Sequence, residues 1–264
     1  MLSRVLTGLA LAALVSLTAR RLGALTSRGS VAATITGTAA VAAGWDWAVL
    51  LIAYFVASSA LSRFGRAAKE RRTASVVAKH GPRDARQVAA NGGLFGLAAL
   101  AMVIRPDTYW IALGAGSLAA SAADTWATEL GTLYGGTPRS VLTWRAVAVG
   151  TSGGVSAIGS LAAVAGSGCI AVLLLVLGWI APIALAVAAG GLAGALVDSV
   201  LGATVQSRRW CDACNLGTER IVHDCGAATR AVGGAGWIDN DMVNLLSAVF
   251  GGVLAAILIR WRMS

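Results

Sequence analysis

Charged residues are scarce in this sequence. Only 12% of its 264 residues are Asp, Glu, Lys or Arg, whereas 57% are hydrophobic and 33 are glycines. Segments that alternate apolar and polar residues are lacking as well, which excludes a closed membrane β-barrel. The apolar runs are long enough to cross a bilayer as helices. We therefore predict an all-α fold, a polytopic membrane helix bundle of about 6–8 transmembrane helices, in one membrane domain over residues 1–264.

Two common sequence signals are absent too. No small-residue cleavage site follows the first apolar segment, residues 2–19, so we interpret it as a retained helix and not as a signal peptide. No GK[ST] sequence occurs, which excludes a Walker P-loop. The net charge of +9 lies mostly in loops. Basic loops set the orientation of a membrane protein and attract anionic lipid or phosphate. We expect no nucleic-acid partner.

Cysteine is also rare, and the four cysteines do not suggest a disulfide framework. Cys169 lies alone in an apolar stretch, where it is interpreted as a packing residue. Cys211 and Cys214 form a CxxC pair, and His223 and Cys225 follow in the same polar loop. Three Cys and one His match a structural Zn²⁺ site in ligand type. Reduced thiols in a packed loop are the alternative, and a redox CxxC is disfavoured because no thioredoxin-like unit surrounds it.

The apolar segments predict eight crossings. Single helices are expected over residues 2–19, 29–44, 47–62, 88–104, 109–131 and 238–260, and two over 146–205, broken near 178–182. Residues 29–44 are short enough to form a re-entrant segment instead. The basic loop 63–86 and the polar loop 206–236 are predicted to be cytoplasmic by the positive-inside rule. Lys79 is then cytoplasmic and Asp107 lies on the opposite side.

Three acidic residues lie in small-residue apolar helices. Asp124 and Glu129 fall within residues 117–136, and Asp198 falls in a similar Gly/Ala segment, 190–202. Because an acid in a membrane helix costs a few kcal/mol or more, each is a functional candidate. We predict that Asp124, Glu129 and Asp198 are catalytic and hold Mg²⁺ with nucleotide phosphates. A buried acid bonded to a neighbouring helix is the alternative. The two segments suggest an internal repeat, although Gly/Ala-rich helices also match by chance.

The first basic loop supplies candidate phosphate ligands. Ser59, Ser62, Arg63 and Arg66 fall on one helical face, and Lys69 follows. Arginine suits phosphate because its fork makes paired hydrogen bonds. The stretch is alternatively a topogenic loop that any polytopic membrane protein carries.

Other candidate phosphate contacts lie near predicted helix ends on the same side. Asn91 opens the helix after the basic loop, and Ser152 lies in a Gly/Ser-rich helix end, both suited to anions. Helix packing explains these glycine-rich stretches equally well. Asn240, Asp241 and Asn244 begin the last helix, where Asp241 is either part of the polar site or an acid favoured by the helix dipole.

Taken together, these motifs resemble those of one family. SSALSRFGRAAKERR, NGG at 91–93, SAADTWATELG, GGTPR at 135–139, GTSGGVS at 150–156, CDAC with HDCG, and DNDMVN at 239–244 occur in the family's order over residues 27–250. The family is the integral membrane family that contains plant phytyl-phosphate kinase and animal transmembrane protein 19. The resemblance implies an isoprenoid monophosphate kinase that uses a nucleoside triphosphate, CTP in the plant branch, to phosphorylate a prenyl or phytyl monophosphate.

The resulting hypothesis is a membrane-bound phosphotransferase whose site faces the cytoplasm. The apolar tail of the prenyl phosphate would lie between helices, among membrane lipids, while Arg63, Arg66, Lys69 and Arg139 would neutralise phosphate charge. Two alternatives remain open at this stage. A small-molecule or ion transporter would also carry broken helices and intramembrane acids, and a structural membrane subunit would need none of these polar motifs.

Overall fold

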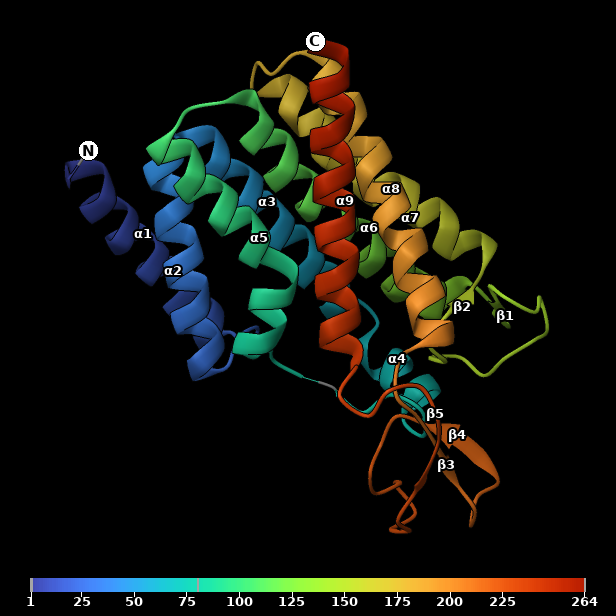
Figure 1. The fold of residues 1–264 in the computed structure, drawn as a ribbon. Helices are drawn as coiled ribbons and strands as arrows, with labels where there is room; N and C mark the ends of the chain where they lie inside the picture. Colours follow the sequence, from blue (N-terminus) through green and yellow to red (C-terminus); the bar gives the residue numbers. More distant parts are fainter. Residues whose placement is uncertain (1, 80, 264) are drawn as a thin grey trace.

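The computed structural model describes residues 2–79 and 81–263, and this part of the chain forms a helix bundle (Figure 1). Its long helices are α1 (Leu2–Arg21), α2 (Ser27–Ala43), α3 (Trp45–Arg63), α5 (Ala85–Ile104), α6 (Thr108–Tyr134), α7 (Ala157–Val176), α8 (Ala181–Thr204) and α9 (Asn240–Met263). The helix α4 (Arg66–Thr73) is short. The predicted all-α membrane fold is confirmed.

One end of the bundle carries α4 and all the strands of the described chain (Figure 1). We call it the loop end; both termini lie at the other end. A two-stranded antiparallel sheet pairs β1 (Arg139–Ser140) with β2 (Gly154–Val155). The predicted loop 206–236 folds into an antiparallel sheet of order β4-β3-β5, with β3 (Arg208–Cys211), β4 (Leu216–Thr218) and β5 (Arg230–Gly233).

Six helices among the described residues are long and apolar enough to cross a membrane: α1, α3, α5, α7, α8 and α9. The helix α6 is longer than these but is not one of the six, and it differs from them in its position within the bundle. Every residue from Ile111 to Ala123 is buried, and α6 contacts α3, α4, α5, α7, α8 and α9. A helix enclosed by other helices needs no lipid-compatible surface, so α6 can carry polar side chains that face protein.

Glycines bring α6, α8 and α9 close together. A Cβ atom added to Gly194 on α8 would lie 2.5 Å from Ala120 Cβ on α6 and 2.8 Å from the Ser247 carbonyl oxygen on α9. One added to Gly190 would lie 2.3 Å from the Gly251 carbonyl oxygen. Small residues allow this backbone approach in membrane bundles, and here it brings the polar side chains of three helices within reach of one another.

Two predicted helix boundaries were wrong. Helix α5 begins at Ala85, where Asp84 forms a capping box with Gln87, so Asn91 does not open the helix but bonds to the Gln87 carbonyl inside it. Helix α7 begins at Ala157, capped by Ser156, and not near residue 146. In both cases the capping hydrogen bonds to the first backbone N–H groups set the helix start, which the hydropathy of the segment does not reveal.

Candidate functional site

Two acidic side chains from separate helices meet inside the bundle. Asp124 on α6 and Asp198 on α8 are in hydrogen-bonding contact with each other. The side-chain amide of Asn244 on α9 is oriented with its nitrogen toward Asp198, and this nitrogen donates to Asp198 Oδ2 at 3.2 Å. Ser247, one turn further along α9, also bonds to Asp198. We call Asp124 and Asp198 the carboxylate pair.

Helix α3 completes the surroundings of the carboxylate pair through Tyr54. This tyrosine is buried, its hydroxyl bonds to Ser121 and Thr125 on α6, and it interacts electrostatically with Asp124. Ser121 in turn donates to the Asn91 carbonyl on α5 at 3.1 Å. The sequence analysis missed Tyr54, although a lone phenol within the apolar run of α3 is a signal that could have found it.

The carboxylate pair lies toward the loop end. At about 1.5 Å per helical residue, Asp124 is roughly 15 Å from the last residue of α6 and Asp198 roughly 9 Å from the last residue of α8. Both helices end at the loop end (Figure 1). Both acids therefore lie in the loop-facing half of their own helices.

Glu129 occupies a separate position, one to two turns nearer the loop end than Asp124. Its carboxylate accepts a hydrogen bond from Ser62 at 2.6 Å and forms an ion pair with Lys69, which also donates to two carbonyls at the end of α3. Among the described residues, Asp124, Glu129 and Asp198 do not form a set of three ligands in mutual range of one ion. Glu129 is therefore not a third ligand beside the carboxylate pair in this structure.

The arginines predicted to bind phosphate are bonded to other groups. Arg63 donates to the Leu22 carbonyl at 2.6 Å, Arg139 donates to the Trp144 carbonyl at 2.9 Å, and Arg66 pairs with Glu70 on the exposed face of α4. Their predicted role in neutralising phosphate charge stays a prediction. In this structure each of the three guanidinium groups already binds an oxygen atom of the protein, two of them backbone carbonyls and one a carboxylate.

Arg83 is a cation near the site that was not predicted from the sequence to bind phosphate. It donates to Ser59 at 3.2 Å, lies 5.9 Å from the ring centroid of Phe55, and interacts electrostatically with Tyr54. Its position in the same basic stretch as Arg63 was visible in the sequence. The backbone of Arg83 is hydrogen-bonded to Ala24 and Thr26. This pairing holds the chain against the bundle, and the Arg83 side chain can therefore reach α3.

The start of α9 joins a second polar cluster. The buried carboxylate of Asp241 accepts from Lys79 at 2.6 Å, and Lys79 also contacts Asp84 at 3.0 Å. Burial opposes the charge of Lys79, but these two carboxylates outweigh it and raise its pKa. Asn240 is exposed, and its carbonyl accepts from Asn244. Asp241 therefore forms an ion pair at the loop end. Of Asn240, Asp241 and Asn244, Asn244 alone contacts the carboxylate pair.

Ser152 packs against α8: a Cβ atom added to Gly202, one turn beyond Asp198, would lie 3.3 Å from Ser152 Cβ. Its hydroxyl donates to Glu219 Oε1 at 2.6 Å, and Gln206 donates to the same oxygen at 2.7 Å. Burial raises the pKa of Glu219. Ser152 thus connects the β1–β2 region to the three-stranded sheet, and its predicted contact with phosphate stays a prediction.

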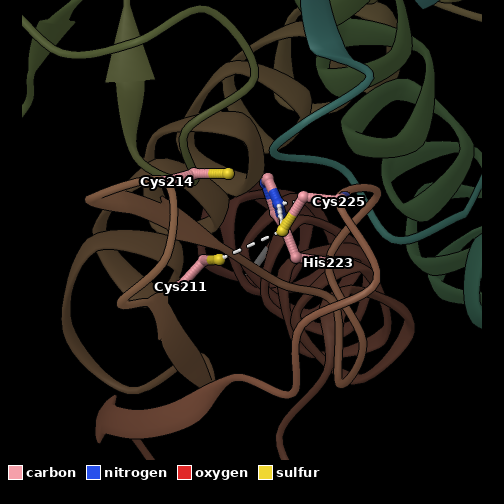
Figure 2. Close-up of side chains that lie close together, drawn as sticks. All are labelled: Cys211, Cys214, His223 and Cys225. Atoms are coloured by element: carbon pink, nitrogen blue, oxygen red, sulfur yellow. Dashed lines mark hydrogen bonds between the residues drawn. The ribbon is translucent and has the colours of Figure 1, made fainter.

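Cys211, Cys214, His223 and Cys225 converge at the tip of the three-stranded sheet (Figure 2). One ligand atom from each lies within 4.8 Å of those from the other three. A hydrogen bond from the Ala227 backbone, helped by His223, lowers the pKa of Cys225 to about 6, and the neighbouring Cys225 raises the pKa of Cys214 to about 11. Such a cluster of thiols and one imidazole has the ligand types of a zinc site.

Two surface hollows lie apart from both clusters. The first measures about 520 Å³ and is lined by apolar residues of α8 and α9 at the end opposite the loops: Pro182, Leu185, Ala186, Leu258 and Trp261. A second, about 330 Å³, follows the face of α9 from Leu246 to Ile257. Successive residues turn by about 100° along a helix, so Leu246 points away from Asn244. Both hollows therefore belong to the outer apolar surface.

Comparison with known proteins places this arrangement in a family. A family described as integral membrane protein DUF92 matches residues 10–252. Protein PGR of Arabidopsis thaliana is 28% identical over 96% of both chains. An uncharacterised membrane protein of Synechocystis is 31% identical over 81% of this chain and 74% of its own, and one of Methanocaldococcus jannaschii is 27% identical over 81% and 77%.

No solved structure matches this chain. The match to the family nevertheless runs from α1 into α9 and includes the carboxylate pair, the basic stretch and the Cys/His loop. The chain is therefore a member of the DUF92 family of integral membrane proteins.

Proposed function

We propose that this protein is an isoprenoid monophosphate kinase, which transfers a phosphoryl group from CTP or another nucleoside triphosphate to a phytyl or prenyl monophosphate. One observation carries the proposal: Asp124 and Asp198 contact each other between helices, in the loop-facing half of the bundle. Two carboxylates in contact need a proton or a cation between them. Mg²⁺ usually binds one or two carboxylates together with phosphate oxygens, and it fits this donor set.

In this proposal Asp124 and Asp198 hold the magnesium ion. The ion would supply charge neutralisation for the phosphates during transfer. Asn244 and Ser247 fix the carboxylate of Asp198, since both bond to it. Tyr54 and the hydroxyl groups around it hold the side of α6 from which Asp124 projects. Phosphoryl transfer depends mainly on positioning and charge, so these residues suffice without a covalent nucleophile.

Cations for the phosphate groups come from two residues between the carboxylate pair and the loop end. Arg83 lies beside Ser59 and Tyr54, and Lys69 lies beside Glu129 and Ser62. Arg66 is 53% exposed at its side chain on α4, where it would attract anionic substrates from solution. The phosphate of the acceptor would lie at this level, and its apolar tail would extend toward the bilayer centre.

A transporter remains the second candidate because it too would need acidic residues inside a bundle. The neighbouring charge favours the kinase. A phosphate site needs cations near its carboxylates, and Lys69 and Arg83 lie between the carboxylate pair and the loop end. The loop end carries most of the basic residues, so we propose that it faces the cytoplasm, where nucleoside triphosphates are found.

The test is direct. Purified protein in detergent is incubated with Mg²⁺, labelled CTP or ATP, and a panel of prenyl monophosphates that differ in chain length, and products are separated by chromatography. We expect a labelled prenyl diphosphate whose formation stops when EDTA is added. Absence of any diphosphate, together with uptake of a substrate or ion by proteoliposomes that hold the same preparation, would reject the kinase in favour of the transporter.

A further inference from the structure

We propose that one Zn²⁺ ion is bound by Cys211, Cys214, His223 and Cys225. The ion stabilises the three-stranded sheet, and the sheet in turn is hydrogen-bonded to the connector between α4 and α5, residues 74–84. The site is structural: four protein ligands close the coordination sphere, which leaves no position for a substrate. The inference concerns the metal site and its mechanical consequence, and it does not depend on the proposed kinase activity.

The distances between the ligand atoms match a metal tetrahedron. With Zn–S bonds of about 2.3 Å and Zn–N bonds of about 2.0 Å, the edges of a tetrahedron are roughly 3.8 Å between sulfurs and roughly 3.5 Å between sulfur and nitrogen. Cys211 Sγ lies 3.7 Å from Cys225 Sγ, and His223 Nδ1 lies 3.2 Å from Cys225 Sγ. A disulfide would require about 2.05 Å between sulfurs. The thiols are thus spaced for a shared ion and not for a bond.

Two turns of the backbone present these ligands to each other. Cys211 ends β3 and pairs with Leu216 on β4, so Cys214 lies in the turn that joins these strands. His223 and Cys225 lie in a second turn, closed by hydrogen bonds from His223 N to the Ala227 carbonyl and from Gly226 N to the His223 carbonyl, each 2.9 Å long. The close-up shows the side chains of both turns directed toward the same space (Figure 2).

The sheet lacks an apolar core that could hold these turns together. Within residues 206–236, all of which the structure describes, the buried side chains are Gln206, Cys211, Thr218, His223 and Thr229. None of these is a large apolar residue. Small units of this kind usually depend on a metal or on disulfides for stability. The imidazole of His223 is itself buried, its Nε2 has no partner among the described residues, and the metal would replace the present contact between Nδ1 and Asp224.

The sheet in turn holds the chain between α4 and α5. Thr218 and the backbone N–H of Glu219 both donate to the Val76 carbonyl, at 3.2 and 2.9 Å, and Arg220 donates to the Val77 carbonyl at 3.0 Å. This connector continues to Lys79, which pairs with Asp241 at the start of α9. The zinc-bound sheet therefore fixes the connector whose lysine contacts α9, and loss of the ion should loosen both.

The experiment measures metal content in the full chain, purified in detergent without chelators. Mass spectrometry of the metals is expected to give one zinc ion per chain for the native protein. Cys211→Ser and Cys225→Ser should lose most of the zinc. Cys169→Ser is the matched control, because it removes a thiol from α7, away from the cluster, and it should retain full zinc content.

A second measurement covers the case in which the serine variants fail to fold. Native protein treated with a zinc chelator is subjected to limited proteolysis, and we expect new cleavage within residues 206–236 and 74–79 that disappears when Zn²⁺ is restored. Three results would overturn the proposal: iron in place of zinc, a disulfide between Cys211 and Cys225, or native protein that neither contains zinc nor takes it up on reconstitution.

Discussion

The carboxylates of Asp124 and Asp198 contact each other although they come from α6 and α8. Two acids so close cannot both remain charged unless a cation lies between them; without one, they share a proton. The close approach of the helices at Gly194 makes this contact possible. The predictions below test the pair, its supports and its side of the membrane.

The first prediction concerns the carboxylate pair. Asp124→Asn and Asp198→Asn keep size and hydrogen-bonding capacity but each removes an anion from the proposed magnesium site. If the ion contributes several kcal/mol to transition-state stabilisation, phosphoryl transfer should fall by about 100-fold or more while the protein stays folded. Product formation and thermal unfolding are measured together. Asp107→Asn, which alters the cap of α6 at the opposite end, is the control and should retain activity. Near-normal transfer by Asp124→Asn would contradict the shared-site mechanism.

The second prediction concerns Lys69 and Glu129, whose side chains are 9% and 19% exposed. Lys69→Met leaves the largely buried Glu129 carboxylate without its cation, which should destabilise the protein by about 3 kcal/mol. Lys69→Met combined with Glu129→Gln removes both charges and should recover most of that loss. Thermal unfolding in detergent measures the three proteins. If the double variant is no more stable than the single one, the ion pair is not what holds α4 against α6.

The third prediction concerns the packing of α8. Gly194→Ala places a methyl group 2.5 Å from Ala120 Cβ, so α8 must move away from α6. Overpacking of this kind costs about 1–3 kcal/mol. Because the shift separates Asp198 from Asp124, activity should fall together with thermal stability. Gly168→Ala on α7 is the matched control, since no atom lies within 4 Å of its added methyl group; equal losses in both variants would show that the effect is not one of helix approach.

The fourth prediction uses the pH dependence of Asp84. Burial disfavours its charge, but hydrogen bonds from the Gln87 N–H and from Lys79 outweigh burial and lower its pKa below 3.8. The ionised form therefore stabilises the fold above pH 3.8, and this contribution disappears as the pH falls through the lowered value. Asp84→Asn retains the helix cap but loses the charge. We expect it to unfold at lower temperature than the native protein at pH 7, and the difference to close below pH 3.8. A constant difference across this range would exclude the ion pair as its cause.

The fifth prediction fixes the orientation. Lys79 lies at the loop end and Asp107 caps α6 at the other end. A membrane-impermeant thiol reagent added to intact cells should label Asp107→Cys, and it should label Lys79→Cys only after the membrane is opened. Peptide mapping separates these sites from the native cysteines, and the native protein serves as the control for background labelling. External labelling of Lys79→Cys would place the loop end outside the cell and remove the argument for a cytoplasmic nucleotide site.

Much of the architecture followed from composition. Long apolar runs with few charges must become helices in a bilayer, because every backbone polar group there needs an internal partner. The helices therefore appeared where hydropathy placed them, apart from the starts of α5 and α7, which depend on capping contacts of Asp84 and Ser156. The close spacing of Cys211 with Cys214 and of His223 with Cys225 likewise identified a loop rich in metal-binding side chains before its fold was known.

Tertiary structure decided which polar groups meet. The five-residue spacing along α6 turns Asp124 and Glu129 about 140° apart but does not name their partners. In the structure Asp124 faces α8 and Asp198, whereas Glu129 faces Lys69 and Ser62. Helical periodicity gives the direction of a side chain around its own axis, but the partner depends on how neighbouring helices pack. For the same reason Tyr54 and Arg83 lie near the carboxylate pair. Arg63 and Arg139 instead donate to backbone carbonyls. The sequence by itself determined which chemical groups were present, and helix packing determined which of them share a site.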